Sequence, residues 1–136
     1  MARARALPAS TGILADPDKV GAIVTKAFTR IAAAWALKGE AAAELAGVST
    51  RTWARVKAAE WVGELNQDQM QRLSALVGLY KGLHLYFSDP LADRWVNLTN
   101  SGPPFLGRSP LQAMREGGLP AILATRNYVD ALRGGL

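Results

Sequence analysis

The sequence predicts an all-α fold in which a helix-turn-helix unit is followed by a small module of further helices. Apolar residues recur at three- and four-residue intervals along much of the 136-residue chain, which is the spacing of one helix face. Asp, Ser and Asn stand before these runs and glycine often follows them, as helix caps and stops do. No segment alternates strictly between apolar and polar residues, so a sheet is not expected.

The composition is that of a folded globular protein, with 49% hydrophobic and 20% charged residues. Its basic excess lies toward the N-terminus. Residues 1–60 hold nine basic and five acidic side chains (+4), whereas residues 61–136 hold seven and six (+1). This bias favours a polyanionic partner for the first half. We find neither a signal peptide nor an apolar run long enough to span a membrane, so we expect a cytoplasmic protein with no membrane partner.

The residue inventory argues against an enzyme, a cofactor or a metal site. The chain has no cysteine, and His84 is its one histidine. Because His84 falls on the apolar side of an expected helix, we interpret it as a core or interface residue. Two carboxylate pairs lie close along the chain, Asp16 with Asp18 and Asp89 with Asp93. Both stand at helix starts, where acids stabilise exposed amide groups.

The first helix is expected to start at Asp16-Pro17-Asp18 and to end near Lys38-Gly39, after a flexible arm formed by residues 1–15. Proline suits the first helical position, and an acid suits the first turn. The apolar face of this helix comprises Val20, Ile23, Val24, Ala27, Phe28, Ile31, Ala34 and Trp35.

Residues 39–57 predict the helix-turn-helix, within a domain that we expect to span residues 16–62. Ala43 is small enough for a helix crossing, Gly47 allows a left-handed turn, and Val48 is the apolar residue beneath that turn. Trp53 and Val56 then hold the second helix against the core. An ordinary helical hairpin with a glycine turn is the alternative.

The outer face of the second helix is expected to contact DNA. Arg51 and Arg55 lie one turn apart, and a guanidinium fork can grip guanine edges or phosphates. The expected contact residues are Ser49, Thr50, Arg51, Arg55 and Lys57. The nearby Glu40, Glu44 and Glu60 oppose this charge, so we expect a homodimer or higher oligomer that multiplies phosphate contacts.

The second half, residues 63–136, is expected to form four helices and a loop. A long helix follows Asn66, and its apolar stripe comprises Met70, Leu73, Leu76, Val77, Tyr80, Leu83, His84 and Phe87. A short helix spans residues 90–96, and a loop covers residues 97–107. Ser109-Pro110 caps the next helix, which Gly117-Gly118 closes. The last helix opens at Leu119-Pro120 and carries Ile122, Leu123, Tyr128, Val129 and Leu132.

Residues 95–100 and 105–111, followed by a short helix that ends in Gly-Gly, resemble the MbcA/ParS/Xre antitoxin family. The order of Trp95, the glycine-containing loop, the Ser109-Pro110 cap and the terminal glycine pair carries the resemblance. The upstream helix-turn-helix lies where Xre-like members have theirs, so the resemblance covers about residues 17–136. The proline-rich segment 101–104 departs from it.

This resemblance implies an antitoxin of a type II toxin-antitoxin system. Members of the family bind a RES-domain toxin that consumes NAD or transfers a group from it, cover the toxin's active-site entrance, and repress their own operon at operator DNA. The implied module at residues 63–136 both dimerises and binds toxin, and Arg133 with its two following glycines would block the toxin pocket. The implied toxin-binding residues are Asn100, Phe105, Arg108, Arg126, Tyr128, Arg133, Gly134 and Gly135.

Two alternatives remain open. One is a helix-turn-helix transcriptional regulator whose C-terminal half only dimerises. The other is an inhibitor that binds protein alone, because three glutamates lie close to the expected DNA surface.

Overall fold

The computed structural model describes residues 17–60 and 63–134, and in these ranges it is all-helical, as predicted. The expected arm at residues 1–15, the Asp16 cap and Gly135 lie outside the described residues. The elements are α2 (Pro17–Ala34), α3 (Gly39–Ala46), α4 (Thr50–Lys57), α5 (Gln67–Tyr86), α6 (Leu91–Arg94), the 3₁₀ turn η1 (Trp95–Asn97), α7 (Pro110–Gly117) and α8 (Leu119–Gly134).

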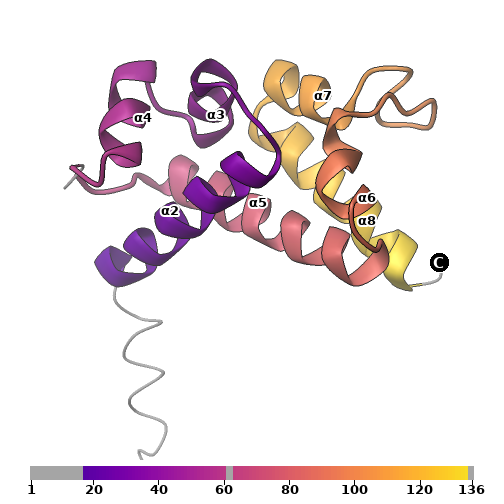
Figure 1. Cartoon of the computed structure of the whole chain (residues 1–136), viewed down its shortest axis with the longest axis horizontal. Helices are drawn as coiled ribbons and strands as arrows, with labels where there is room; N and C mark the ends of the chain where they lie inside the picture. The colour runs from indigo at the N-terminus through magenta and orange to yellow at the C-terminus, as the bar shows by residue number, and fades with distance from the viewer. Residues whose placement is uncertain (1–16, 61–62, 135–136) are drawn as a thin grey trace, which may run out of the picture.

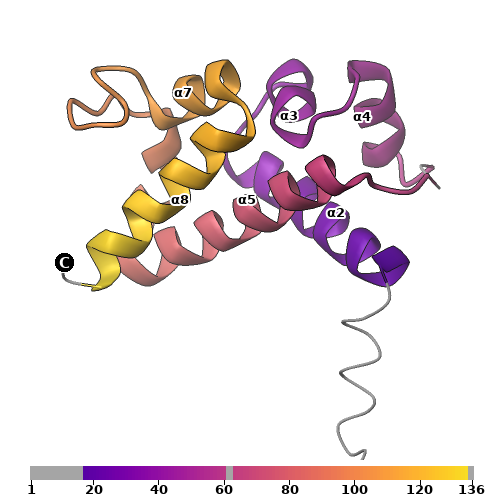
Figure 2. The ribbon, with the colours of Figure 1, turned by 180° about the vertical axis from the view of Figure 1, so that it is seen from behind.

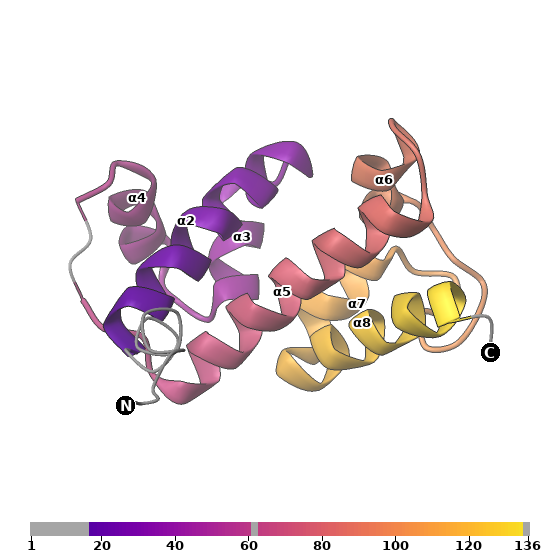
Figure 3. The same ribbon diagram turned by 90° about the horizontal axis from the view of Figure 1, so that it is seen from below.

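Helix α5 runs through the middle of the molecule and belongs to both halves. Helices α2, α3 and α4 gather around its N-terminal part, while α6, α7 and α8 gather around its C-terminal part (Figures 1 and 3). It packs most extensively against α8 and next against α2. The reverse view shows α7 and α3 side by side above it (Figure 2), so the halves also meet there.

The first helix ends at Ala34, four residues before the predicted end near Lys38-Gly39. The chain reverses at Ala36, which adopts a φ of 56°. The Leu37 amide donates to the Ala32 carbonyl at 2.9 Å and the Ala36 amide donates to Ala33 at 3.0 Å, which together close the helix. Glycine is the residue that usually marks such a left-handed helix end, and here the position is occupied by alanine. The end of α2 could therefore not be recognised from the sequence.

The start of α5 agrees with prediction. Asn66 accepts from the Gln69 amide at 2.8 Å, and the Gln69 side chain accepts in return from the Asn66 amide at 3.0 Å. This reciprocal pair satisfies two amides that a helix start leaves unbonded.

Helix α5 is buried on more sides than the predicted stripe. Leu73, Leu76 and Leu83 lie in the core as expected, but Leu79 is fully buried too. Gly82 faces α8 so closely that a Cβ there would come within 3.2 Å of Val129. Because this helix separates two groups of helices, one apolar stripe does not describe it.

The last helix buries a narrower face than predicted. Ile122, Thr125 and Val129 are buried, whereas Leu123 is 43% exposed. The Thr125 hydroxyl donates to the Ala121 carbonyl at 2.8 Å. This bond satisfies the hydroxyl, which allows a threonine to occupy a core position. Leu123, two residues earlier in the helix, is turned toward solvent instead.

An aromatic cluster forms the core of the second half. Tyr128 stacks on Trp95 at a ring separation of 6.1 Å and meets Phe105 edge-on at 5.1 Å. Trp95 and Phe105 also meet edge-on, at 5.8 Å. These contacts fasten the loop after η1 to α8.

Candidate functional sites

The turn between α3 and α4 has the geometry that the sequence predicts. Gly47 ends α3 in the left-handed region, at a φ of 75°. The Val48 amide donates to the Ala43 carbonyl at 3.0 Å, and Ser49 caps α4 by accepting from the Thr52 amide at 3.0 Å. Such a turn fixes the angle between the two helices.

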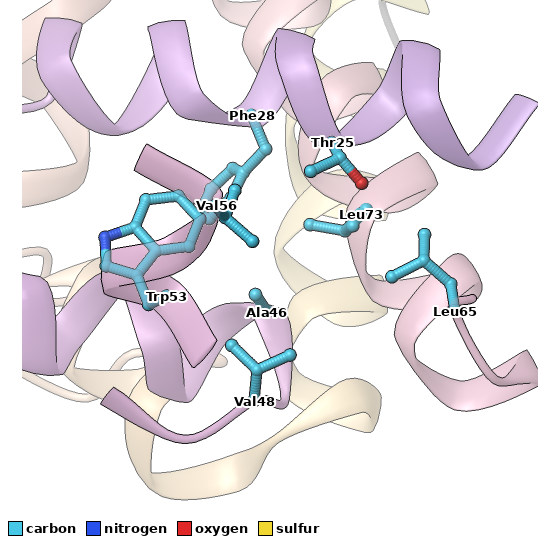
Figure 4. Close-up of a pocket in the computed structure, with 8 residues that line it drawn as sticks. All are labelled: Thr25, Phe28, Ala46, Val48, Trp53, Val56, Leu65 and Leu73. Carbon is cyan, nitrogen blue, oxygen red and sulfur yellow. The ribbon is translucent and has the colours of Figure 1, made fainter. Parts of the chain in front are cut away.

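The inner face of α4 lies on an apolar core that it shares with α2, α3 and α5. Figure 4 shows Trp53, Val56 and Phe28 converging with Leu73 on a small cavity of about 10 Å³. Thr25 is the one polar side chain in the lining, and its buried hydroxyl has no hydrogen-bond partner among the described residues. A cavity this small and apolar is a packing feature of the helix-turn-helix and not a ligand site.

The outer face of α4 presents all five predicted DNA contacts. Ser49, Thr50, Arg51, Arg55 and Lys57 are exposed. The described ion pairs involve none of the three basic residues among them, so these cations are available to phosphates. The Ser49 hydroxyl differs, because it is already engaged with Thr52 as the helix cap.

Two of the glutamates expected to weaken DNA binding are held by an arginine from the second half. Arg115 on α7 makes a close ion pair with Glu44, with Nε at 2.8 Å, and reaches Glu40 at 3.4 Å. From the sequence alone, these acids oppose only the basic residues near them along the chain. In the folded protein Arg115 offsets part of their charge, while Glu60 stays exposed without a described ion pair.

Helix α5 supports the helix-turn-helix from below. Gln69 donates to the Gly47 carbonyl at 3.0 Å, and Arg72 donates to the Glu44 carbonyl at 3.2 Å. Arg72 is itself fixed by Asp68 at 2.8 Å. The bond from Gln69 satisfies the Gly47 carbonyl. The bond from Arg72 adds a second donor to the Glu44 carbonyl, which already accepts from the Gly47 amide at 3.2 Å. The sequence offered no signal for them, because the partners lie 22 and 28 residues apart.

The loop between η1 and α7 is tied together by its own backbone. The Asn100 amide donates to the Arg108 carbonyl at 3.1 Å, and the Gly107 amide donates to the Asn100 carbonyl at 2.7 Å. The Asn100 side chain accepts from Gly102 at 2.9 Å. Phe105 is fully buried beneath the loop. Asn100 and Phe105 therefore shape this loop from within.

Arg108 closes the same loop from its C-terminal side. Its guanidinium donates to the carbonyls of Phe105 at 3.0 Å and Pro104 at 3.3 Å, and it pairs with Glu116 at 2.7 Å. Hydrogen bonds from Arg108 and Gln112 lower the pKa of Glu116 below its ordinary value of 4.5. Arg108 thus connects the loop to α7.

The predicted partner-facing residues of α8 divide into two groups. Tyr128 lies in the aromatic cluster. Arg126 lies across Gly78 of α5, and both Arg126 and Arg133 approach Asp130, at 3.7 and 3.1 Å. Gly134 is the last described residue. The loop and the end of α8 lie on the side of the molecule away from α4 (Figures 1 and 3).

His84 joins the end of α5 to α6. Its Nε2 lies 2.7 Å from Asp93, its Nδ1 lies 3.7 Å from Asp89, and its ring packs on Tyr80 at 4.3 Å. The potential ligand atoms of His84, Asp89 and Asp93 lie within 4.8 Å of one another. Nε2 is hydrogen-bonded to Asp93, whereas Nδ1 lies beyond hydrogen-bond distance of Asp89, so one carboxylate holds the ring in place. Burial, together with Asp93 and Asp89, raises the pKa of Tyr80 above its ordinary value of 10.0.

Exposed apolar side chains concentrate in the second half, a feature that the sequence analysis missed. Seven large hydrophobic residues of the described chain are exposed, and six of them follow residue 84. They are Leu85, Tyr86, Leu91, Leu98, Leu106 and Leu123, with Ile23 the exception. Their exposure could not be read from periodicity, because several lie in loops or at helix ends.

None of the described helices combines the length and the apolar character that crossing a bilayer requires.

Comparison with known proteins identifies the first half. A family model described as the antitoxin Xre-like helix-turn-helix domain matches residues 20–78, which include α3, α4 and the N-terminal part of α5. The uncharacterized protein y4oB of Sinorhizobium fredii (strain NBRC 101917 / NGR234) is 36% identical over 112 residues, covering 81% of this chain and 84% of that protein. No solved structure gives a significant match. The chain thus carries an Xre-like helix-turn-helix domain of antitoxins at residues 20–78, and over most of its length it belongs to one protein family with y4oB.

Proposed function

We propose that this protein is the antitoxin of a type II toxin-antitoxin system, which represses its own operon and neutralises a RES-domain toxin. The observation that carries the proposal is a separation of surface chemistry. Six exposed cations without a described ion pair lie on the first half and two, Lys81 and Arg94, on the second, whereas six of the seven exposed large hydrophobic residues lie on the second. A cationic surface suits a polyanion and an apolar surface suits a protein.

The DNA-binding half would use the outer face of α4. Arg51 and Arg55 project from a helix that Ser49 and Trp53 hold in a fixed position, so their guanidinium groups can enter a groove with little rearrangement. Lys26, Arg30, Lys38 and Lys57 are further exposed cations of this half without a described ion pair. They would add attraction to phosphates that does not depend on sequence.

The toxin-binding half would use the loop from Asn100 to Arg108 and the end of α8. Arg133 is the proposed plug for the NAD pocket, since its guanidinium could occupy the place of a bound phosphate or ribose contact. Asp130 holds this guanidinium at 3.1 Å in the free protein. When the Arg133 side chain enters the toxin pocket, either its ion pair with Asp130 breaks or Asp130 stays paired with it inside the interface. Asn100, Phe105 and Arg108 would act by shaping the docking loop.

We further propose that the protein acts as a dimer or larger assembly. One α4 offers few cationic side chains, and doubling the phosphate contacts raises both the affinity and its salt dependence. In this arrangement the protein itself performs no reaction and needs no cofactor or metal.

The toxin-binding proposal is tested by co-expression with the reading frame that adjoins this gene. That frame is expected to stop growth when expressed alone and to be harmless when the full-length antitoxin is present. Removal of residues 133–136 is expected to abolish protection, whereas replacement of the exposed Lys81 by Ala should leave it intact. Full protection by the truncated chain would rule out Arg133 as the plug.

The DNA-binding proposal is tested with duplex DNA from upstream of the gene. Replacing Arg51 and Arg55 together by Ala is expected to weaken binding and to reduce the slope of log affinity against log salt by about 0.9 for each lost phosphate contact. Lys81→Ala is again the control, since Lys81 lies on the second half. An unchanged slope would place the phosphate contacts on other residues.

A second candidate is a transcriptional regulator whose C-terminal half only dimerises. The exposure of Leu85 at 71%, Tyr86 at 46% and Leu91 at 38% favours it, because these side chains surround the end of α5 and could cover one another in a dimer. Under this alternative the adjoining frame is not toxic. Leu85→Asp would then dissociate the dimer and weaken operator binding.

A further inference from the structure

Leu106 combines two features that oppose the stability of the free protein. Its side chain is 72% exposed, the largest value among the exposed large hydrophobic residues. Its backbone lies in the left-handed region, at a φ of 55°. A leucine with this φ is strained, because its Cβ crowds the following carbonyl. Glycine would serve the fold better at this position.

The backbone holds Leu106 in place. The amides of Phe105 and Leu106 both donate to the Gly102 carbonyl, at 2.8 and 3.1 Å. The next residue, Gly107, donates to the Asn100 carbonyl at 2.7 Å. On the inner side Phe105 is fully buried against Trp95 and Tyr128. The tip is therefore organised before any partner arrives, and its leucine points away from the core.

The surroundings of Leu106 indicate the chemistry of its partner. Residues 98–107 contain no charged side chain. The nearest guanidinium, that of Arg108, is bound to Glu116 and to two loop carbonyls. Leu98 is also exposed, at 42%. An uncharged, apolar and rigid tip suits a hydrophobic pocket on a protein and offers nothing to a phosphate backbone.

We infer that Leu106 is the apolar anchor by which this protein docks into a hydrophobic pocket on its toxin. Strained backbone that persists because the surrounding structure holds it is a known feature of binding sites. Presenting the anchor in one conformation lowers the entropy lost on binding. The inference rests on the proposed function, and it names a contact separate from the Arg133 plug.

The experiment compares Leu106→Gly with Ile23→Ala in the full-length chain. Ile23 is a matched control, because it is 58% exposed but lies on α2 in the first half, away from the loop. The probe is the purified toxin encoded beside this gene, inactivated in its active site. Binding is measured by calorimetry, thermal unfolding is followed by circular dichroism, and operator binding is measured in parallel.

We expect Leu106→Gly to weaken toxin binding by at least about tenfold, the loss typical of an interface anchor. Its unfolding midpoint should be equal or higher, because glycine adopts this φ without strain. Operator affinity of Leu106→Gly should not change, and Ile23→Ala should bind toxin like the wild type. Leu106→Ala, which keeps the backbone strain but removes the anchor, should lose the same affinity.

Three results would overturn the inference. Wild-type toxin affinity in both Leu106 variants would show that the anchor lies elsewhere. Loss of self-association at unchanged toxin affinity would assign the tip to a second copy of the chain. Failure of the wild-type protein itself to bind the toxin would reject the proposed function, and with it the anchor, whereas the first two results leave the proposed function standing.

Discussion

At the scale of single residues, Thr25 shows how a polar group weakens the core below α4. Its hydroxyl is buried and has no hydrogen-bond partner among the described residues, although Thr29 one turn later donates to the Thr25 carbonyl at 3.0 Å. A buried hydroxyl without a partner loses its hydration and gains nothing in return. The apolar cavity beside it provides no second polar group that could hold a water.

Thr25→Val is therefore expected to stabilise the protein by about 1 kcal/mol. Valine has nearly the shape of threonine and leaves no polar atom in the cavity. Urea unfolding followed by circular dichroism measures the change. Thr29→Val is the control and should destabilise slightly or have no effect, since it removes a satisfied hydroxyl. A loss of stability in Thr25→Val would mean that the hydroxyl has a partner in solution.

Residue patterns predicted the helix starts well because capping is local. Ser49, Asn66 and Ser109 each accept from the amide three residues ahead, which any reader of the sequence can anticipate. The end of α2 was missed because an alanine occupies the left-handed position at Ala36. Leu106 was missed for a related reason, since nothing in its type signals a positive φ or solvent exposure.

At the scale of elements, the contact between α3 and α7 joins the DNA-binding half to the second half. Arg115 holds the carboxylates of Glu44 and Glu40, which would otherwise lie unneutralised near a phosphate backbone. Sequence reasoning could not pair residues 71 and 75 positions apart. The exposure of the proposed DNA-contact residues was thus predictable, but the charge that surrounds them was not.

Arg115→Ala is expected to weaken operator binding several-fold at low salt, with a smaller effect at high salt, because it frees two negative charges near the DNA. Stability should fall by at most about 1 kcal/mol, as for other exposed ion pairs. Binding to upstream duplex DNA at two salt concentrations provides the measurement.

Replacing Glu40 and Glu44 by Gln in the Arg115→Ala background separates charge from structure. The triple variant is expected to recover operator affinity, because it removes the repulsion without restoring the ion pairs. Persistently weak binding in this variant would show that Arg115 acts by positioning α3 mechanically.

The link between the loop and α7 should depend on pH. The pKa of Glu116 is lowered in the folded protein, mainly by Arg108, so its contribution to stability is present above its ordinary value of 4.5. That contribution disappears as the pH falls through the lowered pKa. The Arg108 ion pair therefore supports the loop at neutral pH and not in acid.

Glu116→Gln tests this dependence. Unfolding midpoints of the variant and the wild type should differ most near neutral pH and converge in acid, below the ordinary pKa of 4.5. Gln112→Ala is a useful comparison, because it removes the weaker hydrogen bond to the same carboxylate but leaves the ion pair. A difference that stays constant with pH would assign the stabilisation to packing.

At the scale of the whole molecule, α5 prevents the two halves from behaving as separate domains. The predicted boundary after residue 62 falls just before this helix, yet Leu73 lines the cavity beneath α4 while Gly82 packs against α8. The family match likewise continues into α5, to residue 78. Local signals located the helices, apart from the end of α2, but they could not show that one helix packs against both groups of helices within a single core.

We expect the chain to unfold in one cooperative transition. The buried residues of both halves form one core, so loss of α5 from either group of helices would expose apolar surface of the other and a half-folded state is unfavourable. Scanning calorimetry should give equal calorimetric and van't Hoff enthalpies for the full-length protein, corrected for any change in association. Two resolved transitions would show that each half has a complete core of its own.

The shared helix also constrains how such proteins diversify. Exchanging everything after residue 66 with the corresponding part of a relative would replace α5 as well. The side chains of the incoming α5 would then have to pack against helices α2 and α3 of another protein, so a new toxin specificity is not expected to arise in this way. A viable exchange would have to join the parental chains within α5, between the residues that pack on α2 and those that pack on α8. Among relatives, crossover points should accordingly cluster inside a helix and avoid the segment that precedes it.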